Sequence, residues 1–159
     1  MKKWFLIAAF TISVQAINAQ QHFLDRGEIA PCNYTGMPNV RTVTNTVTVL
    51  LPEETVINSH VCGKVVSVFQ VSNESLVLVK TTEDLYVGFA HLKKAYVKNG
   101  DEVQLKTPIG MPLPGNAAGT WSLFISYDTP EKEVPCEKAI EMIRLTQPKS
   151  IVMQNNLKK

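Results

Sequence analysis

The alternating segment at residues 42–51 constrains the fold of this chain more than any other stretch. Apart from Leu50, its apolar residues stand at odd positions and its threonines at even ones: the apolar set is Val43, Val47, Val49 and Leu51, and the hydroxyl set is Thr42, Thr44, Thr46 and Thr48. Successive side chains of a strand point to opposite faces. The segment therefore predicts a half-buried strand with a hydroxyl-bearing outer face.

The rest of the chain predicts further strands and one helix. Strand-like segments follow at residues 65–71, 76–80, 83–92, 101–105 and 120–127. The polar residues 72–75 between the first two predict a hairpin turn. Near the C-terminus, Pro135 precedes apolar residues at positions i, i+3, i+4 and i+7 from Cys136, which indicates a helix with one apolar stripe. The predicted fold class is mostly β, with a C-terminal helix packed on the sheet.

Residues 1–19 have the features of a secretory signal peptide. Lys2 and Lys3 precede an apolar run at residues 4–16, and Ala19 provides a small residue at the cleavage site. The run is too short to span a bilayer. Cleavage would leave 140 residues, the size of one domain, and would remove the two lysines that account for the formal charge of +2. We expect an exported protein of the periplasm or cell surface, with no nucleic-acid partner and no membrane attachment after cleavage.

The chain has three cysteines, which in an exported protein predict one disulfide and one free thiol. We favour a bridge between Cys32 and Cys136, because they lie on either side of the predicted β segments and the bridge would tie the N-terminal arm to the C-terminal helix. Cys62 would then be a buried free thiol. The other two pairings stay open at this point.

Several short motifs follow one another between Thr44 and Tyr127. They are Gly63-Lys64-Val65-Val66, Phe89-Ala90-His91-Leu92, Gly100-Asp101-Glu102-Val103, Pro108-Ile109-Gly110, and the glycine-spaced residues 115–119 that run into Trp121. Their order resembles the lysostaphin-type, or LytM-like, zinc metallopeptidase family. There a strand is followed by Y-x-H-L, a G-D-x-V turn, an I-G step and a final H-L-H-F-E strand. The resemblance implies a barrel-sandwich-like β-sheet domain.

The resemblance also implies one zinc ion with three protein ligands and a water molecule that attacks a peptide bond. The family's H-x-x-x-D pair falls on Thr44 and Thr48, and its H-x-H pair falls on Trp121 and Leu123. None of these side chains is a zinc ligand. His91 occupies the position of the family's histidine that assists the reacting water. We therefore expect a degenerate, catalytically inactive domain without a cofactor, in which His91 is vestigial.

A shifted alignment leaves other readings open. The family's trailing glutamate falls on Ile125 or on Ser126, depending on the register of the last strand. His60 and Cys62 are two residues apart, so in an extended segment they would share a face and, with His91, could form a displaced metal site or a cysteine–histidine catalytic pair. In the alternative interpretation His60 is half-buried near a turn and Cys62 is a small buried apolar residue.

Trp121 has two interpretations. It fills the vacated metal cavity together with Leu123, or it forms a binding cleft with Phe89 and His91 that offers flat surfaces to a glycan or peptide. A third possible function for the chain is a lipoyl-type carrier domain, which has a similar G-D-x-V turn. Such a carrier requires an exposed lysine at a hairpin tip flanked by apolar residues. No lysine of this sequence has that setting.

The expected organisation is a signal peptide at residues 1–19, an N-terminal arm at 20–41, a peptidase-like β domain at 42–128, a loop and helix at 129–148, and a polar tail at 149–159. Family members without zinc ligands are known as regulators of cell-wall amidases or as peptidoglycan-binding scaffolds. The resemblance therefore implies a cell-envelope protein whose partner is peptidoglycan or a cell-wall hydrolase. The alternative is an active cell-wall peptidase that uses the displaced site.

Overall fold

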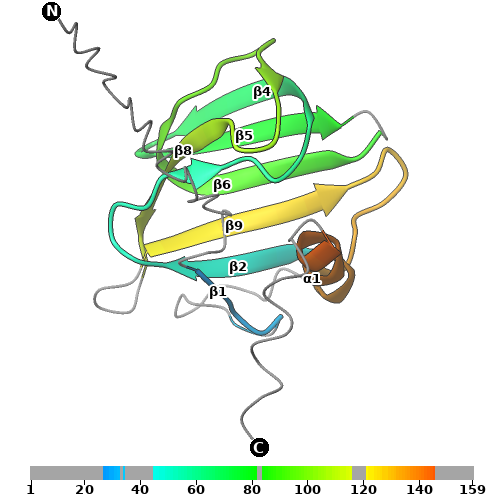
Figure 1. The fold of residues 1–159 in the computed structure, drawn as a ribbon, viewed down its shortest axis with the longest axis horizontal. Coiled ribbons are helices and arrows are strands. Elements are labelled where there is room, and N and C mark those ends of the chain that lie inside the picture. The colour runs from blue at the N-terminus through cyan, green and yellow to red at the C-terminus, as the bar shows by residue number, and fades with distance from the viewer. Residues whose placement is uncertain (1–26, 33, 35–44, 82–83, 116–120, 146–159) are drawn as a thin grey trace, which may run out of the picture.

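The structure is a computed structural model, and it describes residues 27–32, 34, 45–81, 84–115 and 121–145. Within these ranges the chain forms one curled antiparallel sheet with a single helix against it (Figure 1). The strands are β1 (Glu28–Ile29), β2 (Thr46–Leu51), β3 (Ile57–Asn58), β4 (Gly63–Val71), β5 (Glu74–Thr81), β6 (Tyr86–Ala95), β7 (Glu102–Val103), β8 (Pro108–Pro114) and β9 (Trp121–Asp128). The mostly β fold class predicted from the sequence is confirmed.

The sheet does not follow the order of the chain. Its strands lie in the order β1-β2-β9-β8-β6-β5-β4-β7, with β3 paired to β8 and a further pairing between β9 and β6. Strand β9 thus lies beside β2, although the two are about 70 residues apart along the chain. This pairing decides which side chains of the first predicted strand meet those of the last.

Strand β2 confirms the alternating pattern. Val47, Val49 and Leu51 are buried in the hydrophobic core. The described strand begins at Thr46, and residues 42–44 of the predicted segment lie outside the described residues. The apolar parity of the segment therefore identifies the core face of β2.

The hairpin of β4 and β5 is confirmed and closes over two residues. Val71 pairs with Glu74, and Ser72 in the turn has a left-handed φ of 54°. Strand β7 is shorter than the predicted strand at residues 101–105, because the chain turns after Val103. In that turn the Thr107 N–H donates to the Gln104 carbonyl.

Strand β8 was missed by the sequence analysis, and so were the two short strands β1 and β3. The seven residues of β8 include three prolines, which lack the N–H that a sheet interior requires. The strand is accommodated because it pairs with β6, β9 and β3 over only a few residues each. Gly110 allows this close approach, since a Cβ there would lie 2.4 Å from the Lys94 carbonyl oxygen.

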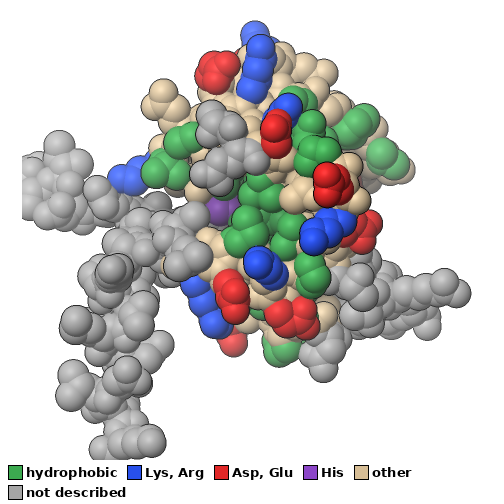
Figure 2. Space-filling view, turned by 90° about the vertical axis from the view of Figure 1, so that its right-hand side faces the viewer, with side chains coloured by type: hydrophobic (Ala, Val, Ile, Leu, Met, Phe, Trp, Pro, Cys, Tyr) green, Lys and Arg blue, Asp and Glu red, His purple; other side chains and the backbone are tan. Residues whose placement is uncertain are grey.

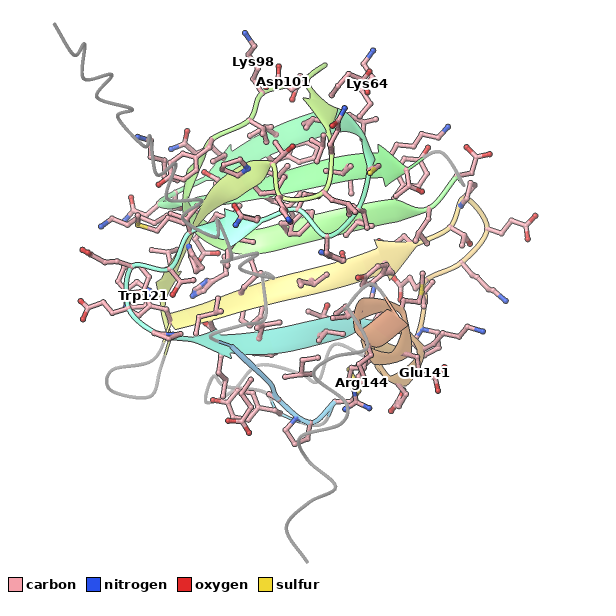
Figure 3. All side chains as sticks on the ribbon, in the orientation of Figure 1. Lys64, Lys98, Asp101, Trp121, Glu141 and Arg144 are labelled. Carbon is pink, nitrogen blue, oxygen red and sulfur yellow. A yellow bond between two sulfur atoms is a disulfide. The ribbon has the colours of Figure 1, made fainter. Side chains whose placement is uncertain are left out.

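Helix α1 (Cys136–Leu145) confirms the predicted helix and contacts β2 and β9. Cys136, Ala139 and Ile143 are buried on the sheet side, whereas Glu141 and Arg144 point away from the sheet (Figure 3). Figure 2 shows the neighbouring end of the sheet, where hydrophobic side chains gather between acidic and basic ones. No helix in the described ranges is long and apolar enough to cross a membrane.

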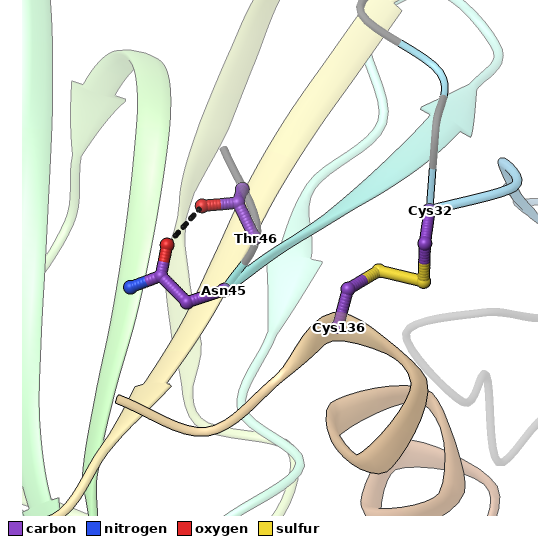
Figure 4. The surroundings of a disulfide bond; sticks show 4 residues. All are labelled: Cys32, Asn45, Thr46 and Cys136. Carbon is purple, nitrogen blue, oxygen red and sulfur yellow. Dashed lines mark hydrogen bonds between the residues drawn. A yellow bond between two sulfur atoms is a disulfide. The ribbon is translucent and has the colours of Figure 1, made fainter. Parts of the chain in front are cut away.

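A disulfide joins Cys32 to Cys136, 104 residues further along the chain (Figure 4). It ties the segment that follows β1 to the first residue of α1. The predicted pairing is therefore confirmed. Because α1 has only ten residues, its position depends on this covalent link as well as on its packed face.

Candidate functional site

The candidate site lies on one face of strands β2 and β9. In their antiparallel register Thr48 lies opposite Phe124, and Val49 lies opposite Leu123. Residues directly opposite each other in such a pair share a face, and neighbours along a strand alternate. We call the hydroxyl face the side of β2 and β9 formed by Thr46, Thr48, Ser122, Phe124 and Ser126. Trp121 and Leu123 lie on the opposite, core face.

His91 reaches the hydroxyl face through a bulge in β6. Between Ser75 and Val77 of β5 the chain advances two residues, whereas the facing residues of β6 advance three, from Phe89 to Leu92. His91 sits in this irregular stretch with a φ of 65°, a conformation that non-glycine residues rarely adopt. The bulge re-aims its side chain, so that its ring lies 5.0 Å from that of Phe124.

The imidazole of His91 is held between two acceptor oxygens. Its Nδ1 lies 3.2 Å from Oε1 of Glu74, and its Nε2 lies 3.4 Å from the Pro114 carbonyl oxygen. The side chain of His91 is almost fully buried, whereas that of Glu74 is half exposed. The ring is therefore oriented by a carboxylate on one side and by packing against Phe124 on the other.

The side chains beside His91 do not fit the zinc ion that the resemblance implies. Thr48 and Phe124, which face each other, offer a neutral hydroxyl and a hydrocarbon ring, neither of which is a usual zinc ligand. Thr44 lies outside the described residues. Within the described ranges, no group of three or more histidine, cysteine, aspartate or glutamate residues is arranged to hold a metal ion. The third ligand position expected at Leu123 lies in the core, and the residue of β9 that faces Thr48 is Phe124.

The structure does not assemble the displaced metal site of His60, Cys62 and His91 that a shifted alignment left open. All three residues are described, and they do not form a metal-binding group. His60 and Cys62 do not share a face, because the chain bends at residues 60–61 and leaves His60 buried and Cys62 exposed. The expectation that Cys62 is a buried thiol is wrong for the same reason.

His60 instead belongs to the core. Its Nε2 is hydrogen-bonded to the hydroxyl of Tyr127, and its ring makes an edge contact with Phe89. Burial lowers the pKa of His60 to about 3, because the charged imidazolium would be desolvated. Burial also raises the pKa of Tyr127. Both groups are neutral near pH 7, so the pair is a structural hydrogen bond of the core.

The cleft expected from Phe89, His91 and Trp121 does not form as one surface. Phe89 is fully buried and Trp121 is 7% exposed, and both belong to the hydrophobic core. Trp121 lies at the start of β9 (Figure 3), where the Nζ of Lys93 lies 6.0 Å from the centre of its ring. Neither aromatic ring is available as a flat binding surface. His91 is the member of this set that lies on the hydroxyl face.

A pocket that no sequence pattern predicted adjoins the hydroxyl face at His91 and at Ala90, which pairs with Phe124. It has a volume of 160 Å³, and its walls come from three adjacent strands: Phe69 and Val71 of β4, Glu74, Ser75 and Leu76 of β5, and Ala90 and His91 of β6. The positive φ of His91 creates part of this wall. A sequence pattern could not reveal it, because the residues adjoin only once β4, β5 and β6 are paired.

The fold is similar to that of solved protein structures, although the sequence itself matches no family. No protein-family model matches the chain, and no curated protein matches it. The structure is similar to the catalytic domain of the prophage-encoded M23 protein EnpA from Enterococcus faecalis, with a TM-score of 0.58, 18% identity, and coverage of 73% of this chain and 93% of that chain. It is also similar to LytU, with a TM-score of 0.55, 19% identity, and coverage of 79% and 92%.

A third similar structure is the catalytic domain of the antimicrobial peptidase lysostaphin from Staphylococcus simulans. Here the TM-score is 0.55, the identity is 14%, and the coverage is 75% of this chain and 95% of that chain. The similarity thus extends over nearly the whole of each of these domains. The chain therefore has the fold of the lysostaphin-type M23 peptidase domains, without a metal-binding group among its described residues.

Proposed function

We propose that this chain is a catalytically inactive, exported peptidase-like domain that binds peptidoglycan through its hydroxyl face. The observation that carries the proposal is the pairing of Thr48 with Phe124 beside His91. A peptidase of this fold needs metal ligands on that face to activate water. A lone histidine cannot catalyse peptide-bond hydrolysis as a general base when it has neither a metal-bound water nor a nucleophile to deprotonate.

The chemistry of the face supports binding without cleavage. Hydroxyl groups donate and accept hydrogen bonds. On the hydroxyl face Thr46, Phe124 and Ser126 are partly exposed, whereas Thr48 and Ser122 are buried, so the two partly exposed hydroxyls flank an accessible aromatic side chain. Such a surface suits the amides and hydroxyls of a wall peptide or glycan, and the aromatic ring adds an apolar contact. One fold neighbour is named an antimicrobial peptidase and another is the catalytic domain of an M23 protein, which supports a peptide-containing ligand by analogy of fold alone.

Export is also part of the proposal. The disulfide between Cys32 and Cys136 supports an oxidising compartment, because such bonds are rare where thiols are kept reduced. Together with the leader expected at residues 1–19, it favours the periplasm or the cell surface.

The test combines a metal measurement with a binding measurement. The mature protein, purified without chelator or affinity metal, is expected to contain no stoichiometric zinc and to sediment with purified peptidoglycan sacculi. Phe124→Ala and Ser126→Ala should each weaken this binding, Phe124→Ala by about tenfold because it removes the aromatic contact. Leu105→Ala, at a site that is 60% exposed and off the hydroxyl face, is the matched control and should bind as the native chain does.

The outcomes separate the alternatives. One tightly bound zinc per chain, or cleavage of wall fragments, would overturn the inactive assignment. No sedimentation with sacculi, together with capture of a cell-wall hydrolase from envelope extracts, would instead identify a regulator of that hydrolase. Thermal unfolding of each variant shows whether a loss of binding reflects a loss of folding.

A further inference from the structure

The pocket between β4, β5 and β6 has the size and lining of a ligand site. Its volume of 160 Å³ is close to that of an engineered apolar cavity of about 150 Å³ that holds benzene. Four of its lining residues are apolar: Phe69, Val71, Leu76 and Ala90. Phe69 is 54% exposed and Val71 is 71% exposed, so apolar surface is available to a ligand at the open side.

The charge of the pocket is set by Glu74. None of the described residues that line the pocket is a lysine or an arginine. One carboxylate oxygen of Glu74 lies against Nδ1 of His91, and its side chain is 51% exposed, so the carboxylate can still accept a hydrogen bond from a ligand. A cationic group at the rim would be attracted, and an anionic group would be repelled.

The geometry of the rim places the charge beside the apolar wall. Glu74 follows the hairpin turn and pairs with Val71, while Leu76 pairs with Phe69. The pair that holds Glu74 is therefore two residue pairs from the one that holds Phe69, and the alternation of side chains puts both on the same face of the hairpin. A ligand that fits must carry its positive charge within a few bonds of its apolar group.

We infer that this pocket binds primary amines attached to an apolar group of about benzene size. Both a free amine and the amino terminus of a peptide that begins with phenylalanine or leucine have this chemistry. The apolar group enters between Phe69, Leu76 and Ala90, and the ammonium group donates to Glu74. The pocket adjoins the hydroxyl face, because Ala90 pairs with Phe124. The inference goes beyond the proposed binding of peptidoglycan, since a small amine is titrated into the isolated protein and its binding is measured without the wall.

The experiment is an NMR titration of the mature, isotopically labelled protein with three matched probes: benzylamine, benzyl alcohol and benzoate. Benzylamine should bind with a dissociation constant on the order of millimolar, as expected for a ligand of this size. Amide signals of Glu74, Ser75, Leu76, Ala90 and His91 should shift most. Benzyl alcohol should bind more weakly, and benzoate weakest.

Two variants separate the charge from the apolar wall. Glu74→Gln should lower the affinity for benzylamine about three- to fivefold, the size of a solvent-exposed ion pair, and leave benzyl alcohol unchanged. Its control is Glu102→Gln, at another exposed acidic residue, in β7. Phe69→Ala should weaken both probes, and its control is Leu105→Ala.

A further arm identifies the source of the amine. Phe-Gly amide should bind if the pocket accepts a peptide amino terminus, and its N-acetylated form should not bind. If benzylamine binds and Phe-Gly amide does not, the site accepts small amines and excludes peptide amino termini. Benzoate affinity equal to that of benzylamine, shifts away from the pocket, or an unchanged benzylamine affinity in Glu74→Gln would each overturn the inference.

Discussion

Thr48 of β2 lies directly opposite Phe124 of β9, on the face of the sheet that also receives the ring of His91. The family pattern places the third ligand one residue earlier, at Leu123, whose side chain is fully buried on the other face. A shift of one residue reverses the face of every side chain in a strand. We therefore propose that Phe124 occupies the third ligand position of a degenerate site, in the register that aligns the family's trailing glutamate with Ser126.

Restoring ligands in this register should create a zinc site. The triple variant Thr44→His, Thr48→Asp and Phe124→His is expected to bind about one zinc per chain, because the two substitutions on β2 and β9 face each other. Metal content after equilibrium dialysis measures the gain.

The matched control is a triple variant that carries Leu123→His in place of Phe124→His and keeps Thr44→His and Thr48→Asp. It should bind no zinc, and it should unfold more easily by roughly 2–5 kcal/mol, because it puts an imidazole into the apolar core in place of leucine. Stoichiometric zinc in the Leu123 variant alone would reverse our assignment of the two faces.

The burial of His60 should make the stability of the protein depend on pH. Its pKa is lowered from 6.5 to about 3 by desolvation, so between these values the unfolded chain binds a proton that the folded chain does not. The contribution to stability is full above pH 6.5 and is lost as the pH falls toward 3. At pH 5 the native chain should have lost about 2 kcal/mol from this group relative to pH 7.

Urea unfolding at pH 7 and pH 5 tests this dependence. His60→Gln, which does not titrate, should lose about 2 kcal/mol less than the native chain between the two conditions. Tyr127→Phe removes one hydrogen bond to His60 and should cost about 1 kcal/mol at pH 7 while keeping the pH dependence. An identical pH dependence in the native chain and His60→Gln would contradict the burial argument.

Removing the disulfide should destabilise the whole domain. The bridge from Cys32 to Cys136 closes a long loop, and its loss should lower the free energy of unfolding by roughly 2–4 kcal/mol. Thermal unfolding of the double variant Cys32→Ala and Cys136→Ala, compared with Cys62→Ser, measures the effect. An unchanged midpoint would mean that packing alone fixes helix α1.

Cys62 should react as a free surface thiol. It is exposed and is not part of the disulfide, so a chromogenic thiol reagent should modify one cysteine per native chain without denaturant. Cys62→Ser should abolish the reaction, while denaturant should add no further reactive thiol. Reaction only after unfolding would show that the side chain is covered.

Much of the fold follows from local patterns of the sequence. The alternation in β2, the polar turn of the hairpin between β4 and β5, and the apolar spacing of α1 each depend on residues close together in the chain. Strand β8 was missed because its three prolines are typical of a loop, and its pairing partners come from elsewhere in the chain.

The candidate site depended on contacts that no local pattern contains. The sequence by itself determined which residue types are present: a histidine at position 91, threonines at 44 and 48, and no histidine, cysteine or carboxylate from Trp121 to Tyr127. The tertiary structure decided which of them meet. The pairing of β2 with β9 selected Phe124, the bulge turned His91 toward it, and the bend after Ser59 buried His60 and exposed Cys62. The physical reason is that the face of a strand residue changes with each step of register, and long-range pairing sets that register.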